Sequence, residues 1–444
     1  MWNLKIVYII ATMNLKSLFL ATVLMTASAS LVQAAAPVQI WVSSDADQKY
    51  YQNMIEVYRQ KVDKDFQAEI KSYGFTEMPD KLSIAVKSGI NTPDIVQFDE
   101  IFFSLYLKGN VPFVDLTDRL AASHLSTGLL PQRKGLFTWK GRTYGIPQSL
   151  SEVVLWYRAD VFQDLGISPN DINTWDKFEA VSKRIKTDSR RMIVLDWSYL
   201  DILLRQRGYD FFGSDGKLFP DSAIVAQTWQ RIVNWSKNDI GMLPGQGGIF
   251  SPDFFANSVA SNGILSIIGA DWYGLDIIQN MDPSHKGKWR AMPLPVWTDS
   301  LSRGRRNTSS FSGQGLVIFK KSQQVDRCWK FIDWVMTDVD ANVQRYLQGN
   351  SFPCYRPAWT DMRFARPEPY FGNQNLAQLL TDGAPGMPFT TQSPLHAMVV
   401  NFLREQYFND VVRGGSGTTV EQAMSGIQQQ IKNMTSGKKP DSKP

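Results

Sequence analysis

Short continuous apolar runs alternate along this chain with longer stretches that have helical spacing. Residues 153–157 form an uninterrupted apolar run of strand length, which is typical of a strand buried on both faces, and residues 38–42, apolar except for Gln39, are a first expected buried strand. Between such runs apolar residues recur at intervals of three or four, as in residues 48–61. The alternation predicts an α/β protein with parallel sheets and helices on both faces. The other strands that we expect are residues 84–86, 95–98, 144–147, 192–195, 263–268 and 316–319.

Local signals fix several helix ends. Thr174 precedes an amphipathic stretch as a cap, Gly166 stops a short helix, and Thr418 or Thr419 caps the last helix after a glycine run. The predicted helices, besides 48–61, are residues 103–108, 116–122, 160–165, 174–187, 200–207, 223–238, 254–260, 325–336, 393–412 and 419–434.

Three segments are typical of a chain that passes between two lobes. In the first, a short strand ends at Pro147, which cannot donate to a ladder, and a polar tract leads into the apolar run at 153–157. Residues 306–315 and 349–357 are the expected second and third crossings. Residues 436–444 are a tail rich in Lys, Ser and Pro, with too few apolar residues to pack.

The N-terminus has the pattern of an export signal. Lys16 precedes an apolar core at 18–25, and Val32, Gln33 and Ala34 form a small-residue cleavage site, so we expect residues 1–34 to be removed after about Ala34. The start is Met1 or Met13. The alternative is an uncleaved anchor, because the joined apolar stretch approaches the roughly 20 residues of a membrane span.

Charge and cysteine content narrow the class of protein and its range of partners. The chain has 47 basic and 42 acidic residues and a formal net charge of +5, a near balance that argues against nucleic acid as a partner. No cysteine lies near residue 34, which argues against a lipid anchor. The two cysteines, Cys328 and Cys354, are open to two interpretations, a disulfide formed after export or two buried thiols.

Five short sequence motifs occur one after another between residues 93 and 331. The first, P-D-I-V, lies within residues 93–99. The second spans residues 136–181 and combines G-x-x-Y-G-x-P, a polar tract, L-W-Y-R and T-W-x-x-F. Residues 269–272 read G-A-D-W, and the last two motifs are residues 313–321 and 329–331. Together they resemble the extracellular solute-binding proteins of ABC importers, and within these the carbohydrate-binding, maltose-binding-protein-like family 1.

The resemblance implies the fold and the partners. The fold would be the type II periplasmic-binding-protein fold, two α/β lobes joined by hinge segments with a ligand cleft between them. The first lobe would comprise residues 35–148 and 312–350, and the second residues 149–311 and 351–435. The expected protein is a periplasmic monomer without cofactor or metal, which closes its lobes on a sugar or oligosaccharide and delivers it to membrane permease subunits.

Candidate ligand-binding residues follow the strands, because open α/β sheets bind ligands at the carboxyl ends of their strands. A sugar needs carboxylates and amides for its hydroxyls and flat aromatics for its C–H faces. The residues just past strand ends are Ser43, Asp45, Gln97 and Asp99 in the first lobe, and Trp197, Tyr199, Asp271, Trp272 and Tyr273 in the second. The resemblance places a sugar-stacking tryptophan at G-x-W, but the extra residue in G-A-D-W leaves Trp272 and Tyr273 both open.

The crossings add further candidates. Ser149 and Ser151 lie in the first, Phe311, Gly313 and Gln314 in the second, and Arg356 follows the third, where the family carries an arginine. An alternative ligand is an anionic sugar derivative, such as a glycerol phosphate or a sulfonated or uronic sugar. It would be held by Arg356 and by Arg303, Arg305 and Arg306 if these turn inward.

Signals for catalysis are weak. His124, His285 and His396 lack metal-ligand spacing, and neither a G-x-S-x-G elbow nor a phosphate-binding loop occurs. We therefore expect a binding protein, and keep an exported carbohydrate-active enzyme as the lesser alternative.

Overall fold

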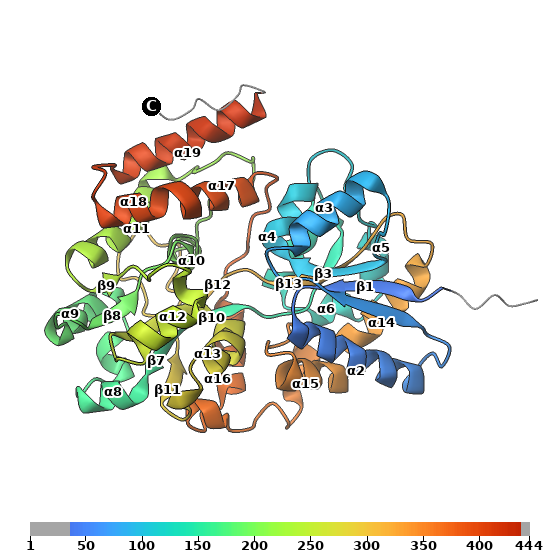
Figure 1. Ribbon diagram of the computed structural model, residues 1–444, viewed down its shortest axis with the longest axis horizontal. Coiled ribbons are helices and arrows are strands. Elements are labelled where there is room, and N and C mark those ends of the chain that lie inside the picture. Colours follow the sequence, from blue (N-terminus) through green and yellow to red (C-terminus); the bar gives the residue numbers. More distant parts are fainter. Residues whose placement is uncertain (1–35, 437–444) are drawn as a thin grey trace, which may run out of the picture. The chain divides into compact units, whose positions relative to one another are not determined.

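The structure is a computed structural model that describes residues 36–436. The predicted signal peptide and all of the predicted tail except Ser436 lie outside the described residues. From Val38 onward the described chain belongs to one compact unit, which contains two lobes with a central sheet each (Figure 1). None of the described helices combines the length and the apolar character that a membrane crossing requires.

The sheet of the first lobe is mixed, which corrects the prediction of parallel sheets. The parallel strands β2, β1 and β3 are followed by β13, which runs antiparallel to both β3 and β6. Strand β13 pairs its first residue, Gln314, with the last residue of β3, Asp99. The carboxyl ends of β1, β3 and β6 therefore meet at one edge. The bounds are β1 Val38–Val42, β2 Ala68–Ser72, β3 Ile95–Asp99, β6 Gly145–Pro147 and β13 Gln314–Ile318.

The sheet of the second lobe has the order β11-β7-β10-β8-β9, with β12 beside β7. All residues of β7 and β10 are buried; the continuous apolar run at 153–157 predicts this for β7, whereas β10 also buries Ser266. Strand β10 is antiparallel to β7 and parallel to β8. The bounds are β7 Glu152–Arg158, β8 Arg191–Val194, β9 Gly241–Met242, β10 Ile264–Ala270, β11 Trp289–Met292 and β12 Ser309–Ser310. A separate hairpin joins β4, Thr138–Trp139, to β5, Arg142–Thr143.

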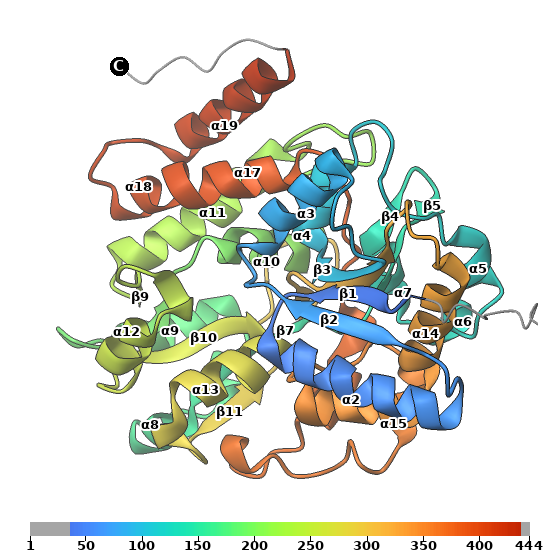
Figure 2. The same cartoon turned by 45° about the vertical axis from the view of Figure 1, so that its right-hand side comes forward.

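Helices from distant parts of the chain cover each sheet. In the first lobe α2 packs against α14 and α15, which come from the far side of the second crossing (Figures 1 and 2). Its helices are α2 Asp45–Lys61, α3 Met78–Ser88, α4 Glu100–Phe103, α5 Thr117–Ala121, α6 Leu125–Gly128, α7 Pro131–Lys134, α14 Val325–Thr337 and α15 Val339–Gln348.

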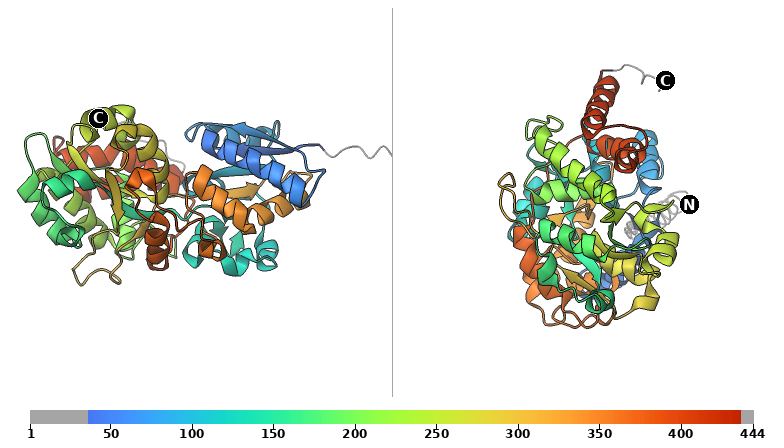
Figure 3. Two further views of the ribbon diagram at one scale, coloured as in Figure 1. Left: turned by 90° about the horizontal axis from the view of Figure 1, so that it is seen from below. Right: turned by 90° about the vertical axis from the view of Figure 1, so that its left-hand side faces the viewer.

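The C-terminal helices return to the second lobe, where α18 and α19 pack on α11 (Figure 3). A π-helical segment, Leu403–Tyr407, joins α17 to α18, and another, Tyr273–Ile278, follows β10. The helices are α8 Ala159–Asp164, α9 Trp175–Ile185, α10 Ser198–Gln206, α11 Ser222–Lys237, α12 Pro252–Phe254, α13 Gln279–Met281, α16 Leu376–Gly383, α17 His396–Phe402, α18 Phe408–Arg413 and α19 Val420–Thr435.

Predicted caps are confirmed, and one predicted strand is wrong. Thr174 accepts from the backbone N–H of Lys177, and Thr419 forms a capping box with Gln422. Residues 84–86 lie in α3 rather than in a strand. The buried residues of this helix, Met78, Leu82 and Ala85, follow helical spacing and leave Ile84 exposed.

The three crossings lie side by side, and one buried cation holds the first two together. Arg133, on α7, donates from Nε to the carbonyl of Ser149 at 3.2 Å and from Nη2 to the carbonyl of Ser312 at 3.0 Å. The backbone N–H of Leu150 donates to the carbonyl of Phe352, which brings in the third crossing. Burial lowers the pKa of the Arg133 guanidinium.

The two cysteines are free and buried, so the thiol interpretation holds. The Cys354 thiol donates to the carbonyl of Pro147 at 3.0 Å. Burial raises the pKa of both thiols to about 12.

Candidate functional site

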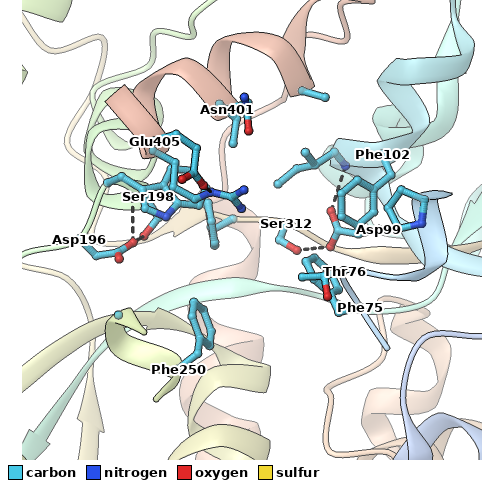
Figure 4. Close-up of a pocket in the computed structure, with 18 of the residues that line it drawn as sticks. Phe75, Thr76, Asp99, Phe102, Asp196, Ser198, Phe250, Ser312, Asn401 and Glu405 are labelled. Atoms are coloured by element: carbon cyan, nitrogen blue, oxygen red, sulfur yellow. Dashed lines mark hydrogen bonds and ion pairs between the residues drawn. The ribbon is translucent and has the colours of Figure 1, made fainter. Parts of the chain in front are cut away.

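A cavity of about 1970 Å³ is lined by residues of both lobes at the meeting point of the strand ends. Eight of the predicted site residues line the cavity: the strand-end candidates Ser43, Asp99, Trp197 and Trp272, and the crossing candidates Ser149, Phe311, Gly313 and Gln314. Figure 4 shows Asp99 and Ser312 on one side of this cavity, with Asp196 and Ser198 on the other.

The first-lobe side of the cavity is a network of hydroxyl and amide groups. Gln97 accepts at Oε1 from both the N–H and the hydroxyl of Ser43, at 2.9 and 2.8 Å. Gln314 donates from Nε2 to the Ser43 hydroxyl at 2.9 Å. Gln97 itself does not line the cavity; its buried side chain positions Ser43, which does.

Asp99 is a buried carboxylate that joins the first lobe to the second crossing. It caps α4 by accepting from the N–H of Ile101 at 2.9 Å, and it also accepts from the hydroxyl of Ser312 and the N–H of Gly313. Burial raises its pKa to about 6, although these donors oppose the shift.

This raised pKa predicts a pH dependence of stability. The folded pKa of Asp99 lies above its ordinary 3.8, so the contribution of Asp99 to stability falls as the pH rises from about 4 to about 6. Relative to Asp99→Asn, the wild-type free energy of unfolding should drop by up to about 3 kcal/mol across that window. Thermal unfolding of both proteins at several pH values measures the difference. Parallel pH profiles would contradict the prediction.

The second-lobe side carries a carboxylate that the strand-end rule points to but that we did not select. Asp196 directly follows the last residues of β8, lines the cavity, and accepts at Oδ1 from the N–H and hydroxyl of Ser198, at 3.0 and 2.6 Å. Burial raises its pKa. The prediction selected its neighbours Trp197 and Tyr199; Trp197 lines the cavity, whereas Tyr199 is buried and its hydroxyl oxygen accepts from the N–H of Ile268 at 3.0 Å.

Aromatic rings line the cavity from both lobes. Phe250 and Trp272 of the second lobe lie nearly parallel, with ring centroids 6.2 Å apart and 12° between their planes. Phe75 and Phe102 of the first lobe form a second pair at 5.0 Å. Phe250 and Phe75 keep exposed fractions of 41% and 44%, so both rings are open to a ligand. Sequence reasoning missed Phe250, Phe75 and Phe102, because an aromatic residue in a turn or a short helical segment carries no pattern that distinguishes a binding surface from core.

Helix α17 and the segment after it close another side of the cavity. Asn401 and Glu405 point into the cavity in Figure 4. Arg404 also lines it and donates from Nε to Glu405 at 2.6 Å. The lining also includes uncharged amides of this segment, of α18 and of α19, namely Gln406, Asn409, Gln429, Gln430 and Asn433.

Seven predicted site residues do not line the cavity: Asp45, Gln97, Ser151, Tyr199, Asp271, Tyr273 and Arg356. Asp45 is exposed at the start of α2, which begins three residues before its predicted start. Ser151 is buried in the first crossing, with its hydroxyl 3.0 Å from that of Ser149. Arg356 donates to the carbonyls of Thr127 and Gly128.

Two of these seven residues resolve questions about the G-A-D-W turn. Tyr273 is buried and donates its hydroxyl to the carbonyl of Ile249 at 2.6 Å, so Trp272 is the aromatic of this turn that faces the cavity. Asp271 is buried, accepts from the N–H of Phe352 at 2.7 Å, and ties the turn to the third crossing. Burial raises the pKa of Asp271 to about 7.

The basic cluster 303–306 lies away from the cavity. Arg303 is exposed, stacks on the ring of Tyr209 and pairs with Asp221. Neither Arg305 nor Arg306 lines the cavity. Within residues 36–436, no group of three or more His, Cys, Asp or Glu side chains is arranged to hold a metal ion.

Known proteins are similar to this chain in sequence and in fold. A family model described as "Bacterial extracellular solute-binding protein" matches residues 22–341. The arabinooligosaccharide-binding protein of Bacillus subtilis (strain 168) is 24% identical over 336 residues, which cover 74% of this chain and 76% of the relative.

Two solved structures show the same architecture. An ABC substrate-binding protein from Listeria monocytogenes, in complex with cycloalternan, has a TM-score of 0.71 at 18% identity and covers 91% of this chain and 99% of its own. The galacto-N-biose-/lacto-N-biose I-binding protein of Bifidobacterium longum has a TM-score of 0.72 at 17% identity and covers 90% and 98%. The fold is thus the predicted type II periplasmic-binding-protein fold, and the chain belongs to the bacterial extracellular solute-binding protein family.

Proposed function

We propose that this protein is the receptor of an ABC importer and binds a neutral oligosaccharide in the cavity between its lobes. The observation that carries the proposal is the pairing of open aromatic rings from both lobes with carboxylates at the cavity wall. Flat rings cover the C–H faces of sugar rings, and carboxylates orient hydroxyls through charge-assisted hydrogen bonds. The arabinooligosaccharide-binding relative and the two sugar-bound structural neighbours support the same ligand class.

The size of the cavity supports an oligosaccharide. Its volume of about 1970 Å³ exceeds the roughly 300–1,000 Å³ of common small-molecule pockets. The lining amides of α18, of α19 and of the segment after α17 offer uncharged hydrogen-bond donors and acceptors to such a ligand. A ligand of several sugar rings would fill much of the cavity, whereas with a single sugar ring most of the cavity would be occupied by water.

The charges of the lining favour a neutral ligand over an anionic one. Asp196, Asp276 and Glu405 line the cavity together with Asp99, while its arginines are Arg404, which is paired with Glu405, and Arg413. The cluster at 303–306, which motivated the anionic alternative, does not reach the cavity. We therefore expect the double variant Arg303→Ala/Arg305→Ala to bind its ligand with unchanged affinity in calorimetry. A tenfold loss would restore the anionic alternative.

Closure of the two lobes would hold the ligand. We propose the lobe boundaries 35–148 with 312–350 and 149–311 with 351–435, which the composition of the two sheets supports. A ligand that contacts both lobes stabilises the closed state by its differential affinity for that state. The closed monomer would then dock on the permease subunits.

Export completes the proposal. We propose cleavage after about Ala34 and a periplasmic location, which the extracellular family supports. We also propose that the protein releases its ligand unchanged and has no enzymatic activity. Incubation with labelled arabinotriose or maltotriose followed by chromatography tests this point, since shorter products would show hydrolysis.

Calorimetric titration tests the main proposal. The mature protein is titrated with neutral linear arabino- and maltooligosaccharides, their monosaccharides, galacturonic acid and glycerol 3-phosphate. We expect the tightest binding from a neutral oligosaccharide. Binding of only the two anions would overturn the proposed ligand class.

A further inference from the structure

A group of ionisable and amide side chains is buried where α4 of the first lobe meets α10 and α17 of the second. We call it the interlobe cluster, and it consists of Glu100, Asp201, Arg205, Asp210, Gln392 and His396. Glu100, Asp201, Arg205 and His396 have exposed fractions of 1%, 2%, 1% and 1%. The cluster lies outside the cavity lining, so ligand contact does not explain it.

Two hydrogen bonds join the lobes at this cluster. Gln392, in the segment before α17, donates from Nε2 to Glu100 Oε2 at 2.8 Å. The backbone N–H of Ala397, in α17, donates to the hydroxyl of Ser104 at 3.1 Å. Helix α17 thus bonds to the first lobe through its start, while its later face lines the cavity with Asn401.

The cluster is incompletely hydrogen-bonded. Among the described residues, the buried side-chain atoms without a hydrogen-bond partner include Oε1 of Glu100, Nη2 of Arg205, Oε1 of Gln392 and both ring nitrogens of His396, while Oδ1 of Asp201 and Nε of Arg205 form an ion pair with each other at 3.2 Å. Unsatisfied buried polar atoms are costly. Their concentration at a junction between two lobes indicates a contact that gains hydration when the lobes move apart.

The charges of the cluster do not balance. Arg205 is its only guanidinium, and its Nε lies 3.2 Å from Asp201 and 3.6 Å from Asp210. Glu100 faces the same groups from the first lobe and adds a third carboxyl. His396 lies beside Arg205, and burial lowers its pKa to about 4, so it is neutral above pH 5. One cation therefore faces three carboxyl groups, and burial raises the pKa of Asp201 to about 7.

Among the described residues, the charged groups that act on Asp201 are Arg205, Asp210 and Glu100. Strand β12 contributes only Ser309 and Ser310. The arginine of α11, Arg231, is engaged by Asp176 and Glu179.

We propose that the interlobe cluster is a proton-linked latch: it holds α17 against α4 while a proton is bound at Asp201, and it loosens when that proton leaves. This inference rests on the proposed hinge motion. Loss of the proton places a second-lobe carboxylate opposite Glu100 of the first lobe, and the like charges repel across the contact. Protonation thereby changes how readily the cavity opens.

The direction of the effect follows from linkage. In the contact state the pKa of Asp201 is raised from 3.8 to about 7, and hydration on opening brings it back toward its ordinary value. Opening then releases a proton, so it becomes more favourable as the pH rises from about 4 to about 7 and is constant above that. Each unit of pKa difference changes the open-to-closed ratio by about tenfold.

The test is energy transfer between two dyes on the ligand-free protein. The labels are attached at Ile84→Cys and Lys183→Cys, both exposed positions, one in each lobe; Cys328 and Cys354 are buried and do not compete. We expect the transfer efficiency to fall from pH 5 to pH 8 in the labelled wild type. Asp201→Asn, which is neutral throughout, should give a constant efficiency, and the exposed control Asp188→Asn should behave as wild type.

A second variant covers a folding failure of Asp201→Asn. Glu100→Gln removes the facing carboxylate from the other lobe and should reduce the pH response at least threefold. An efficiency that does not depend on pH, or a pH response unchanged in both variants, would overturn the latch. Because no ligand is present, this result is independent of whether the cavity binds oligosaccharides.

Discussion

Trp272→Ala should weaken oligosaccharide binding by about 30-fold or more, which corresponds to about 2 kcal/mol, the scale of an interface hot spot. Trp272 lines the cavity and lies nearly parallel to Phe250, so its truncation removes a flat surface for the C–H face of a sugar and exposes Phe250 to water. Calorimetry with the tightest neutral oligosaccharide measures the loss. The melting temperature without ligand should change little, because Trp272 is only partly buried.

The neighbouring residue supplies a matched control. Tyr273→Phe removes a buried hydroxyl that donates to the carbonyl of Ile249, but it changes nothing in the cavity lining. We expect a stability loss of about 1 kcal/mol and unchanged affinity. If Tyr273→Phe weakens binding as strongly as Trp272→Ala, the turn acts through its fold rather than through the Trp272 ring.

Gly313→Ala should destabilise the folded protein by about 4 kcal/mol or more. Losses of this size occur only when a substitution causes a severe steric or backbone defect. A Cβ atom at this position would lie 1.8 Å from Nη2 of the buried Arg133, and the backbone has a φ of +146°, which L side chains rarely adopt. Arg133 cannot retreat without giving up its bonds to the first and second crossings. Thermal unfolding followed by circular dichroism measures the effect.

Gly415→Ala is the control for this substitution. No atom lies within 4 Å of a Cβ added at Gly415, so the melting temperature should stay within about 2 °C of wild type, as for most surface substitutions. An equally mild effect of Gly313→Ala would show that the crossings tolerate displacement of Arg133.

The sequence predicted those parts of the fold and the cavity that depend on local patterns. The buried runs of β1 and β7 and the caps Thr174 and Thr419 are visible in consecutive residues. Because candidate ligand-binding residues follow strand ends, the sequence alone indicates Ser43, Asp99 and Trp272, and all three line the cavity.

Other parts depend on tertiary packing that no local pattern records. The antiparallel pairing of β13 follows from its arrival from the other lobe. Tyr273 and Asp271 share a turn with Trp272, yet their side chains are buried and bond to Ile249 and to Phe352, which are distant in the sequence. Phe75 comes from a turn and Phe250 from a short 3-10 helix, and the cavity side of α17 is set by its packing on both lobes.

The central claim is that one ligand contacts both lobes, and hydrogen–deuterium exchange with and without the tightest neutral oligosaccharide tests it most directly. The account predicts slower exchange in the presence of ligand at residues 99–105 of the first lobe and at residues 196–198, 248–250 and 272–277 of the second, all of which include cavity-lining positions. Slower exchange in one lobe alone, or at neither set of residues under saturating ligand, would contradict it.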